Sequence, residues 1–265
     1  MTQAFPDVSS YQAGLKIQPG TVAVIAKATE GTYYEDPCFK DFMAQAEHVG
    51  AIEAGYHFLK QGNAAAQAEA CYAFAGAWPM MIDCEPLTGS MPTITDCIEF
   101  TQRFHELGGR VFACYFPRWY WDRVGGNFIE LRDRYGVALV SSNYDGYTDA
   151  PSGAGWLSYG GVTPSWWQYT RNFPYGGKQI DFNAFRGTLS DLRSLIQGDD
   201  MTPMDVWSYK GNNGDGNTPD SPDVHQTVLT TRDNVSALQA TVAQHGAELQ
   251  GISALLARVA EKLGA

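Results

Sequence analysis

The chain has 265 residues, of which 44% are hydrophobic and 13% aromatic, and its formal net charge at pH 7 is −11. A chain of this length and apolar content can bury one large core with something smaller beside it. The acidic charge argues against nucleic acid and anionic membrane surfaces as electrostatic partners. No stretch approaches the roughly 18 consecutive apolar residues of a transmembrane helix, so the sequence predicts no membrane span.

Cysteine usage and the N-terminus bear on the compartment. The five cysteines are widely spaced without a C-x-x-C pair, which predicts reduced, mostly buried thiols rather than a disulfide framework or a zinc site. Residues 1–5 lack the basic and apolar regions of a signal peptide, so the sequence predicts no export by that route.

Strand-like and helical patterns alternate through residue 198, which predicts an α/β architecture with a largely parallel sheet. Strands are expected at 5–9, 21–28, 51–59, 78–85, 111–116, 137–142, 166–169 and 180–185. Helices are expected at 36–49, 64–76, 95–107 and 189–196. This order suits either an open doubly wound sheet or a small, irregular TIM-like α/β barrel. Four acids favour the barrel, because they fall at or near the ends of apolar runs, or within the last run: Asp7, Asp83, Glu85 and Asp181.

The composition changes after residue 198. The Gly-, Asn- and Asp-rich stretch within 199–226 cannot bury a core and reads as a flexible linker. In 227–265, apolar residues recur at alternating spacings of three and four, which is typical of a coiled-coil seam. We therefore expect a folded domain at 1–198, a linker at 199–226 and a coiled-coil helix at 227–265 that forms a homo-oligomer. Binding of a wall component or another protein is the alternative for this helix.

Asp83 and Glu85 are the most informative pair of residues in the chain. Side chains on a strand alternate between its faces, so these two carboxylates point the same way. Two like charges beside apolar neighbours should raise one pKa and leave the other group ionised, as acid and base work on a glycosidic bond requires. The alternative is a pair of solvated acids in a turn that follows the strand.

The sequence lacks the motifs of several other kinds of catalytic or binding site. The sequence contains no G-x-S-x-G, no phosphate-binding glycine loop and no H-E-x-x-H, and its His and Cys spacings give no plausible metal cage. We therefore expect neither a metal nor a cofactor. Carboxylates set among many aromatic residues remain, and polysaccharide hydrolysis is the chemistry that these two residue types serve together.

Several stretches, read in order, resemble a known family. They are Asp7 to Gln12, Ala26 to Phe39, Gly55 to Phe58, Ile82 to Glu85, Trp167 to Tyr169 and Ile180 to Asn183. Together they are similar to the N-acetylmuramidases of glycoside hydrolase family 25, over about residues 5 to 195. One departure is the short approach to Asp181 through Gly176 and Gly177, where many relatives carry a longer turn.

The resemblance implies a compact α/β barrel that cleaves the β-1,4 bond between N-acetylmuramic acid and N-acetylglucosamine in bacterial peptidoglycan. By position, Glu85 matches the general acid, Asp83 its partner carboxylate, and Asp7 and Asp181 the other two acids of the site. The resemblance also implies retention of anomeric configuration, with the substrate's own 2-acetamido group as the nucleophile. With no signal peptide, a phage endolysin that accumulates in the host cytoplasm and acts at the cell wall is the preferred biological role. A non-catalytic wall-binding module on the same fold is the alternative, and retention of all four acids argues against it.

Aromatic residues provide candidates for the floor that binds sugar, with core packing as the alternative for each: Tyr56, Phe58, Tyr115, Tyr144 and Trp167. Lys27 follows an apolar run and either pairs with one of the acids or is an ordinary surface lysine. The cluster Trp119-Tyr120-Trp121 either lines the cleft or covers a helix.

Overall fold

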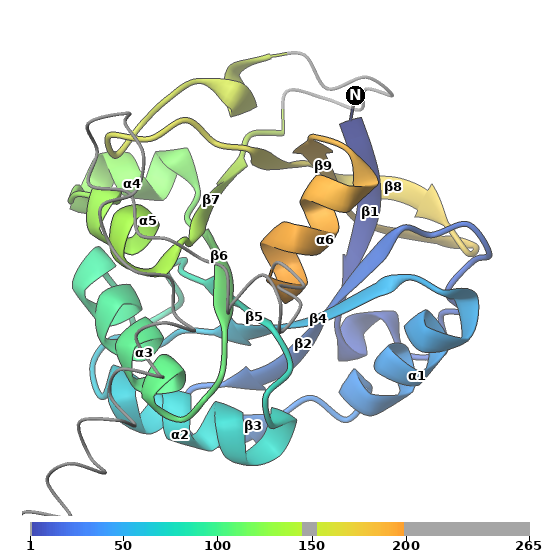
Figure 1. The fold of residues 1–265 in the computed structure, drawn as a ribbon, viewed down its shortest axis with the longest axis horizontal. Coiled ribbons are helices and arrows are strands. Elements are labelled where there is room, and N and C mark those ends of the chain that lie inside the picture. The colour runs from blue at the N-terminus through green and yellow to red at the C-terminus, as the bar shows by residue number, and fades with distance from the viewer. Residues whose placement is uncertain (1, 145–152, 199–265) are drawn as a thin grey trace, which may run out of the picture. The chain divides into compact units, whose positions relative to one another are not determined.

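The computed structural model describes residues 2–144 and 153–198, which form an α/β domain (Figure 1). Its strands are β1 (Thr2–Val8), β2 (Ala23–Glu30), β3 (Tyr34–Glu35), β4 (Ile52–Phe58), β5 (Met80–Asp83), β6 (Val111–Tyr115), β7 (Ala138–Ser142), β8 (Trp166–Tyr175) and β9 (Lys178–Arg186). Its helices are α1 (Phe39–Val49), α2 (Ala64–Ala75), α3 (Ile94–Glu106), α4 (Arg118–Val124), α5 (Ile129–Tyr135) and α6 (Leu189–Gln197). Short 3-10 turns lie at Ser10–Gln12 and Ala154–Trp156.

The strands close into a barrel. The hydrogen-bonded order is β1-β9-β8-β7-β6-β5-β4-β2, and β2 pairs with β1 to complete the ring, while β3 extends β2 on the outside. The pairings are parallel except those of β3 and of β9, which runs antiparallel to both β8 and β1. The predicted irregular α/β barrel is confirmed, and the open doubly wound sheet is wrong.

A tight hairpin produces the reversed strand. Tyr175 pairs with Lys178, and the two residues between them, Gly176 and Gly177, have φ angles of 58° and 80°. Only glycine adopts such angles without steric cost, and two of them in succession suit the twist of adjacent antiparallel strands. The short turn that departs from the family pattern is therefore what turns β9 back alongside β8.

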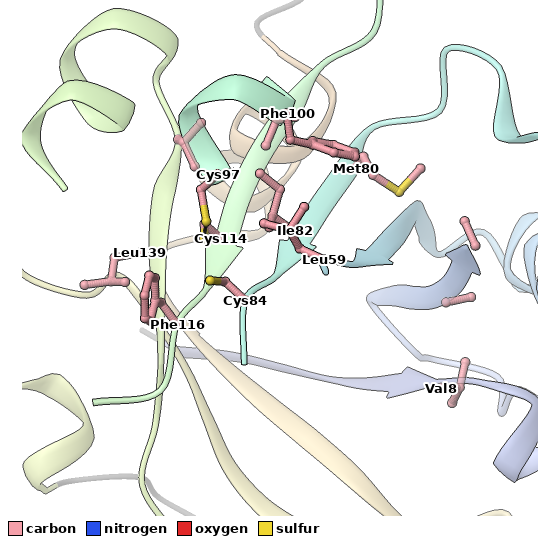
Figure 2. Packing of buried hydrophobic residues seen from close by; sticks show 14 of the residues in the cluster. Val8, Leu59, Met80, Ile82, Cys84, Cys97, Phe100, Cys114, Phe116 and Leu139 are labelled. Carbon is pink, nitrogen blue, oxygen red and sulfur yellow. Dashed lines mark hydrogen bonds between the residues drawn. The ribbon is translucent and has the colours of Figure 1, made fainter. Parts of the chain in front are cut away.

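Alternation along the strands separates two hydrophobic cores. One set of side chains fills the inside of the barrel, including Phe5, Ile25, Met81 and Trp166. The residues that alternate with them pack between the strands and the helices, where Figure 2 shows Ile82 and Cys84 together with Cys97 and Cys114. Because both faces of these strands are buried, each strand reads in the sequence as a nearly continuous apolar run.

Helix α6 closes one end of the barrel. Its Leu192 and Ile196 side chains are fully buried in the inner core, and in Figure 1 the helix lies across the opening of the ring of strands. Arg110, which precedes β6, donates a hydrogen bond of 3.0 Å from Nη2 to the Leu195 carbonyl. The plugged end is thus the one where the parallel strands begin, and the end where they finish is free to form a site.

The sequence missed three short elements, namely β3, α4 and α5. Helices α4 and α5 have seven residues each, too few for a reliable helical period. The helix expected from residue 36 begins at Phe39, because the Asp36 carboxylate accepts hydrogen bonds of 2.9 Å from the backbone N–H groups of Ser10 and Cys38. The predicted linker and coiled coil lie outside the described residues. Within 2–144 and 153–198, no helix is long and apolar enough to cross a membrane.

Candidate active site

The four predicted carboxylates, together with Glu30, line a single cavity of about 340 Å³ at the end of the barrel where the parallel strands finish. Asp7 lies near the end of β1, Asp83 is the last residue of β5, and Glu85 follows two residues later. Asp181 comes from the beginning of the reversed strand β9, and it stands directly opposite Asp7 in the register of the two strands. The structure thus brings together all four acids that the sequence singled out.

The local strand geometry explains why Asp83 and Glu85 share a face. Ile82 and Cys84, which alternate with them, are fully buried in the outer core. That anchoring directs the two carboxylates to the other side, where both line the cavity. The predicted common orientation is confirmed: Asp83 and Glu85 are half-buried and line the same cavity, rather than standing apart in a solvated turn.

Asp7 is held by amide side chains. Its Oδ2 accepts hydrogen bonds from Gln168 Nε2 at 2.9 Å and from Asn183 Nδ2 at 2.7 Å. Trp166 Nε1 donates to Asn183 Oδ1 at 2.8 Å, which fixes the orientation of that amide. Burial raises the pKa of Asp7, and the two amide hydrogen bonds oppose the increase. Neither Gln168 nor Asn183 was predicted as a site residue, although both lie inside stretches that carry the family resemblance.

Asp83 lies in an environment that disfavours its charged form. Burial raises its pKa well above the ordinary value, and the negative charge of Glu85 raises it further, while Lys27 acts in the opposite direction. Its Oδ1 atom is buried, and none of the residues that the structure describes donates a hydrogen bond to it. A buried carboxylate oxygen without a donor is costly, so this atom is poised to accept a hydrogen bond from a bound molecule.

Glu85 and Asp181 are also more basic than ordinary carboxylates. Burial and then the charge of Asp7 raise the pKa of Glu85, against the effect of Lys27. Burial, followed by the charges of Asp7 and Glu85, raises the pKa of Asp181 to about 8. Carboxyl groups in this cavity therefore hold their protons to higher pH than ordinary acids do, as general acid catalysis requires.

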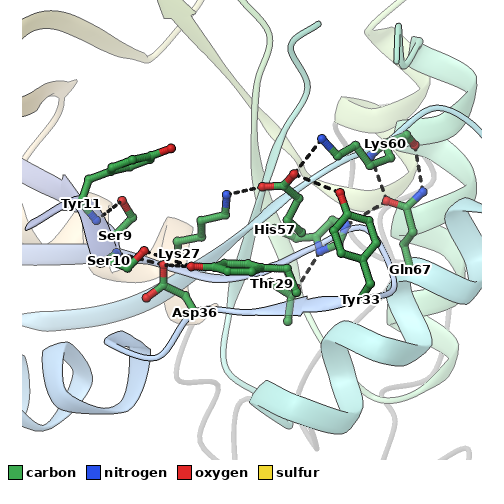
Figure 3. A network of polar contacts seen from close by, with 12 residues as sticks. Ser9, Ser10, Tyr11, Lys27, Thr29, Tyr33, Asp36, His57, Lys60 and Gln67 are labelled. Atoms are coloured by element: carbon green, nitrogen blue, oxygen red, sulfur yellow. Dashed lines mark hydrogen bonds and ion pairs between the residues drawn. The ribbon is translucent and has the colours of Figure 1, made fainter. Parts of the chain in front are cut away.

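Lys27 lines this cavity, and together with Lys60 it forms an ion-pair cluster around Glu30 that the sequence did not fully predict (Figure 3). Lys27 is buried, and its Nζ lies 2.6 Å from Glu30 Oε2, while Lys60 Nζ lies 2.7 Å from Glu30 Oε1. Both ammonium groups also lie over the ring of Phe58, 4.9 and 4.7 Å from its centroid. Lys27 therefore pairs with an acid, as one alternative held, but with Glu30 rather than one of the four.

Buried polar contacts hold β4 in place beside the ion pairs of Glu30 with Lys27 and Lys60. Thr29 Oγ1 lies 2.8 Å from His57 Nδ1, and Gln67 Oε1 lies 3.2 Å from the other ring nitrogen (Figure 3). Burial lowers the pKa of His57 to about 4, so the ring is neutral at physiological pH. This histidine acts as a structural link between β2, β4 and α2.

Four of the five predicted sugar-binding aromatics line the cavity: Tyr56, Phe58, Tyr115 and Tyr144. Trp167 does not. It is 1% exposed in the outer core, packed edge-on against Trp156, with Nε1 donating to the Asn143 carbonyl at 3.0 Å. Alternation along β8 explains the correction, because Trp166 and Gln168 face the inside of the barrel and Trp167 must then face outward.

Substitutions should distinguish the buried aromatic residue Trp167 from Tyr144, which lines the cavity. Trp167→Ala is expected to lower the free energy of unfolding by about 3–5 kcal/mol, because it empties a buried site, while the folded fraction keeps its affinity for substrate. Tyr144→Ala, at a residue that is 43% exposed, should leave stability nearly unchanged and raise KM. Denaturant unfolding and steady-state kinetics on both variants measure this, and equal effects of the two on KM would contradict the assignment.

Comparison with known proteins agrees with the fold. The model of the family "Glycosyl hydrolases family 25" matches residues 6–178. The N,O-diacetylmuramidase of Chalaropsis sp is 29% identical over 217 residues, covering 72% of this chain and 98% of that protein. The lysozyme of Streptococcus phage Cp-1 is 25% identical over 181 residues, covering 63% of this chain and 51% of that protein.

Solved structures show the same architecture. A muramidase from Trichobolus zukalii superposes with a TM-score of 0.62 at 26% identity, covering 74% of this chain and all of that one. A family GH25 lysozyme from Aspergillus fumigatus gives a TM-score of 0.61 at 23% identity, with 74% and 99% covered, which shows the fold. Since the family match spans the strands that carry Asp7, Asp83 and Glu85, the chain belongs to glycosyl hydrolases family 25 and is a glycoside hydrolase.

Proposed function

We propose that this chain hydrolyses the β-1,4 bond between N-acetylmuramic acid and N-acetylglucosamine in bacterial peptidoglycan. The observation that carries the proposal is the gathering of Asp7, Asp83, Glu85 and Asp181 in one cavity with aromatic walls. Two of the relatives are N,O-diacetylmuramidases, and a muramidase shares the fold. Among the described residues, no group of His, Cys, Asp and Glu is arranged to hold a metal ion, and the proposed steps need only carboxylates.

Glu85 is the proposed general acid. Its raised pKa lets it keep a proton at a pH where an ordinary glutamate is ionised, and that proton is delivered to the oxygen of the leaving sugar. Once the bond is broken, the ionised Glu85 takes a proton from water, which then attacks the anomeric carbon. One residue thus serves as acid in the first step and as base in the second.

Asp83 is proposed to bind the 2-acetamido group of the substrate. The unpartnered Oδ1 accepts the acetamide N–H, which turns the carbonyl oxygen toward the anomeric carbon as the nucleophile. A hydrogen bond to the ionised carboxylate lowers its pKa, so substrate binding favours the charge on Asp83 and the proton on Glu85. Asp181 is the alternative partner for the acetamide. Attack by this neighbouring group and then by water inverts the anomeric centre twice, so the configuration is retained.

Product analysis tests the proposal. Purified peptidoglycan is digested with the wild-type chain, the new reducing ends are reduced with borohydride, and the products are hydrolysed to amino sugar alcohols. The proposal predicts muramitol as the new end group, and release by Glu85→Gln that is lower by about 100-fold or more. Glucosaminitol, or no reducing ends with the wild-type chain, would contradict it. Proton NMR of the first product formed should show the β anomer.

The dependence of kcat/KM on pH should respond to the charges that surround Glu85. Asp7→Asn removes the largest electrostatic contribution that raises the pKa of Glu85, so that pKa falls and the alkaline limb of kcat/KM moves to lower pH. Lys27→Met removes a charge that lowers the same pKa, so the limb should move to higher pH. The comparison uses the midpoint of the limb rather than the maximal rate. Shifts of both variants in one direction would contradict the assignment of that limb to Glu85.

We also propose that the chain is a phage endolysin that accumulates in the host cytoplasm and acts at the cell wall. The phage lysozyme among its relatives supports this role. All five cysteines of the domain are free thiols, which suits a reducing compartment.

For residues 227–265 we propose self-association through the coiled coil. Light scattering on the full chain and on a 1–198 truncation is expected to give an oligomer and a monomer, respectively. A monomer in both samples would contradict the proposal.

A further inference from the structure

A second cavity of about 220 Å³ opens beside the four carboxylates, at the same end of the barrel. It is formed by α4 and by the residues at and after the end of β7: Arg118, Trp119, Asp122, Ser142, Asn143 and Tyr144. Tyr144 lines both cavities and therefore forms the boundary between them. A chain-like molecule held over the carboxylates that extends past this tyrosine enters the second cavity.

Trp119 is exposed there in an otherwise buried aromatic segment. The next two residues are core residues: Tyr120 donates a 2.6 Å hydrogen bond to the Pro92 carbonyl, and Trp121 packs on Phe116. Trp119 is 47% exposed, and no other tryptophan within 2–144 and 153–198 belongs to the exposed hydrophobic residues. An indole exposed at the mouth of this cavity offers a flat apolar face on which a sugar ring can pack.

The walls of this cavity are held in place before anything binds. The Arg118 guanidinium donates to the carbonyls of Leu157 and Ser158 and lies 4.5 Å from the ring centroid of Tyr159. The guanidinium of Arg123 lies 5.3 Å from the ring centroid of Trp119, within the range of a cation–π contact. A site with preset side chains loses less conformational entropy when a ligand enters.

The polar groups around Trp119 suit a sugar. Asp122 offers carboxylate acceptors and Asn143 an amide, which together can pair with the hydroxyl and acetamido groups around a hexosamine ring. The charges differ from those of the first cavity, where five carboxylates face one lysine. Here Arg118 balances Asp122, and Arg123 adds a positive charge beside the indole. A strand whose muramic acid units carry carboxylates is therefore repelled less at this position.

We propose that the cavity beside Trp119 is a further sugar-binding subsite, which holds a hexosamine of the same glycan strand beyond the sugars that flank the cleaved bond. The inference rests on the proposed function, since it takes the glycan strand as the substrate. The indole face covers the apolar face of the sugar ring, and the polar groups of α4 and β7 bind its edge. The subsite thereby favours long strands over short fragments.

The test compares peptidoglycan fragments of increasing length. Trp119→Ala is expected to lower kcat/KM for long fragments about tenfold, mainly through KM, which is the factor that corresponds to about 1.4 kcal/mol of binding. The shortest fragment that is cleaved should be unaffected, because it does not reach past Tyr144. Trp119→Phe keeps an aromatic face and should restore most of the preference for length. Leu189→Ala, at an exposed apolar residue on α6, is the matched control and should change nothing.

The outcomes separate this inference from the proposed function. Equal loss on all lengths, or no loss on any, with an active wild-type chain would overturn the subsite and leave the function standing. If the wild-type chain cleaves no fragment, titration calorimetry that measures binding of the longest fragment still tests the subsite. Weaker binding by Trp119→Ala than by Leu189→Ala would support the subsite, and equal binding would overturn it.

Discussion

Glu85→Gln is expected to lower kcat for peptidoglycan hydrolysis by about 100- to 10,000-fold, the range that loss of a general acid produces. Glutamine preserves the shape of the side chain but has no proton to give to the leaving oxygen at any accessible pH. Because the substrate contacts of Asp83 and of the aromatic walls are retained, KM should change little. Reducing-end release under saturating substrate measures the effect, with mass spectrometry confirming the substitution so that trace wild-type enzyme is excluded.

Glu47→Gln, on the exposed side of α1, makes the same chemical change away from the cavity and should leave kcat unchanged. If Glu85→Gln keeps kcat within about threefold of the wild-type value, far below the effect of losing a general acid, another residue supplies the proton. The raised pKa of Asp181, about 8, makes it the next candidate.

Asp83→Asn is expected to act in opposite directions on activity and stability. Activity should fall by about 100-fold or more, because the amide is a weaker acceptor for the substrate N–H and carries no charge to polarise it. Stability should rise by about 1–3 kcal/mol at pH 8, because the substitution removes a buried carboxylate whose Oδ1 has no donor among the described residues. Such a gain corresponds to an increase in Tm of roughly 2–4 °C per kcal/mol for a domain of this size.

The sign of the pH dependence follows from proton uptake. The pKa of Asp83 is higher in the folded chain than in the unfolded one, so between those two values the folded state binds more protons. The free energy of unfolding of the wild-type chain therefore falls as pH rises through that window. The Asp83→Asn variant has no titrating group at this position, so its free energy of unfolding does not fall for this reason. Calorimetric Tm values at pH 5 and pH 8 should show the advantage of Asp83→Asn growing with pH. Asp133→Asn, at an exposed ion pair, is the control, and a lower Tm for Asp83→Asn would contradict the argument.

The sequence allowed all eight barrel strands and four of the helices to be located, because buried parallel strands appear as apolar runs and longer helices show their period. The acids were found for a related reason: a charged residue that interrupts or ends such a run needs a partner or a function. Asp83 and Glu85 could also be placed on one face, since Ile82 and Cys84 between them are apolar.

The same burial explains the wrong prediction for Trp167. Where both faces of a strand are covered, apolar residues occupy inward and outward positions alike, so the inner face of the stretch 166–169 cannot be chosen from its sequence. Only the register of β8 against β7 and β9 decides that Trp166 and Gln168 face inward. The contacts of Glu30 with Lys27 and Lys60 could not be predicted from the sequence for a different reason, because they depend on how β2 and the end of β4 are placed relative to each other.

The pairing of β1 with β9 makes formation of the active site depend on folding of the whole domain. Asp181, the register partner of Asp7, and the hydrogen-bond partners Gln168 and Asn183 lie more than 150 residues further along the chain. Contacts so distant along the chain form late in folding, since the loop between them must be closed first. A nascent chain that still lacks β9 has neither a closed barrel nor a complete set of carboxylates. The cavity of carboxylates is therefore complete only when β9 is inserted between β8 and β1.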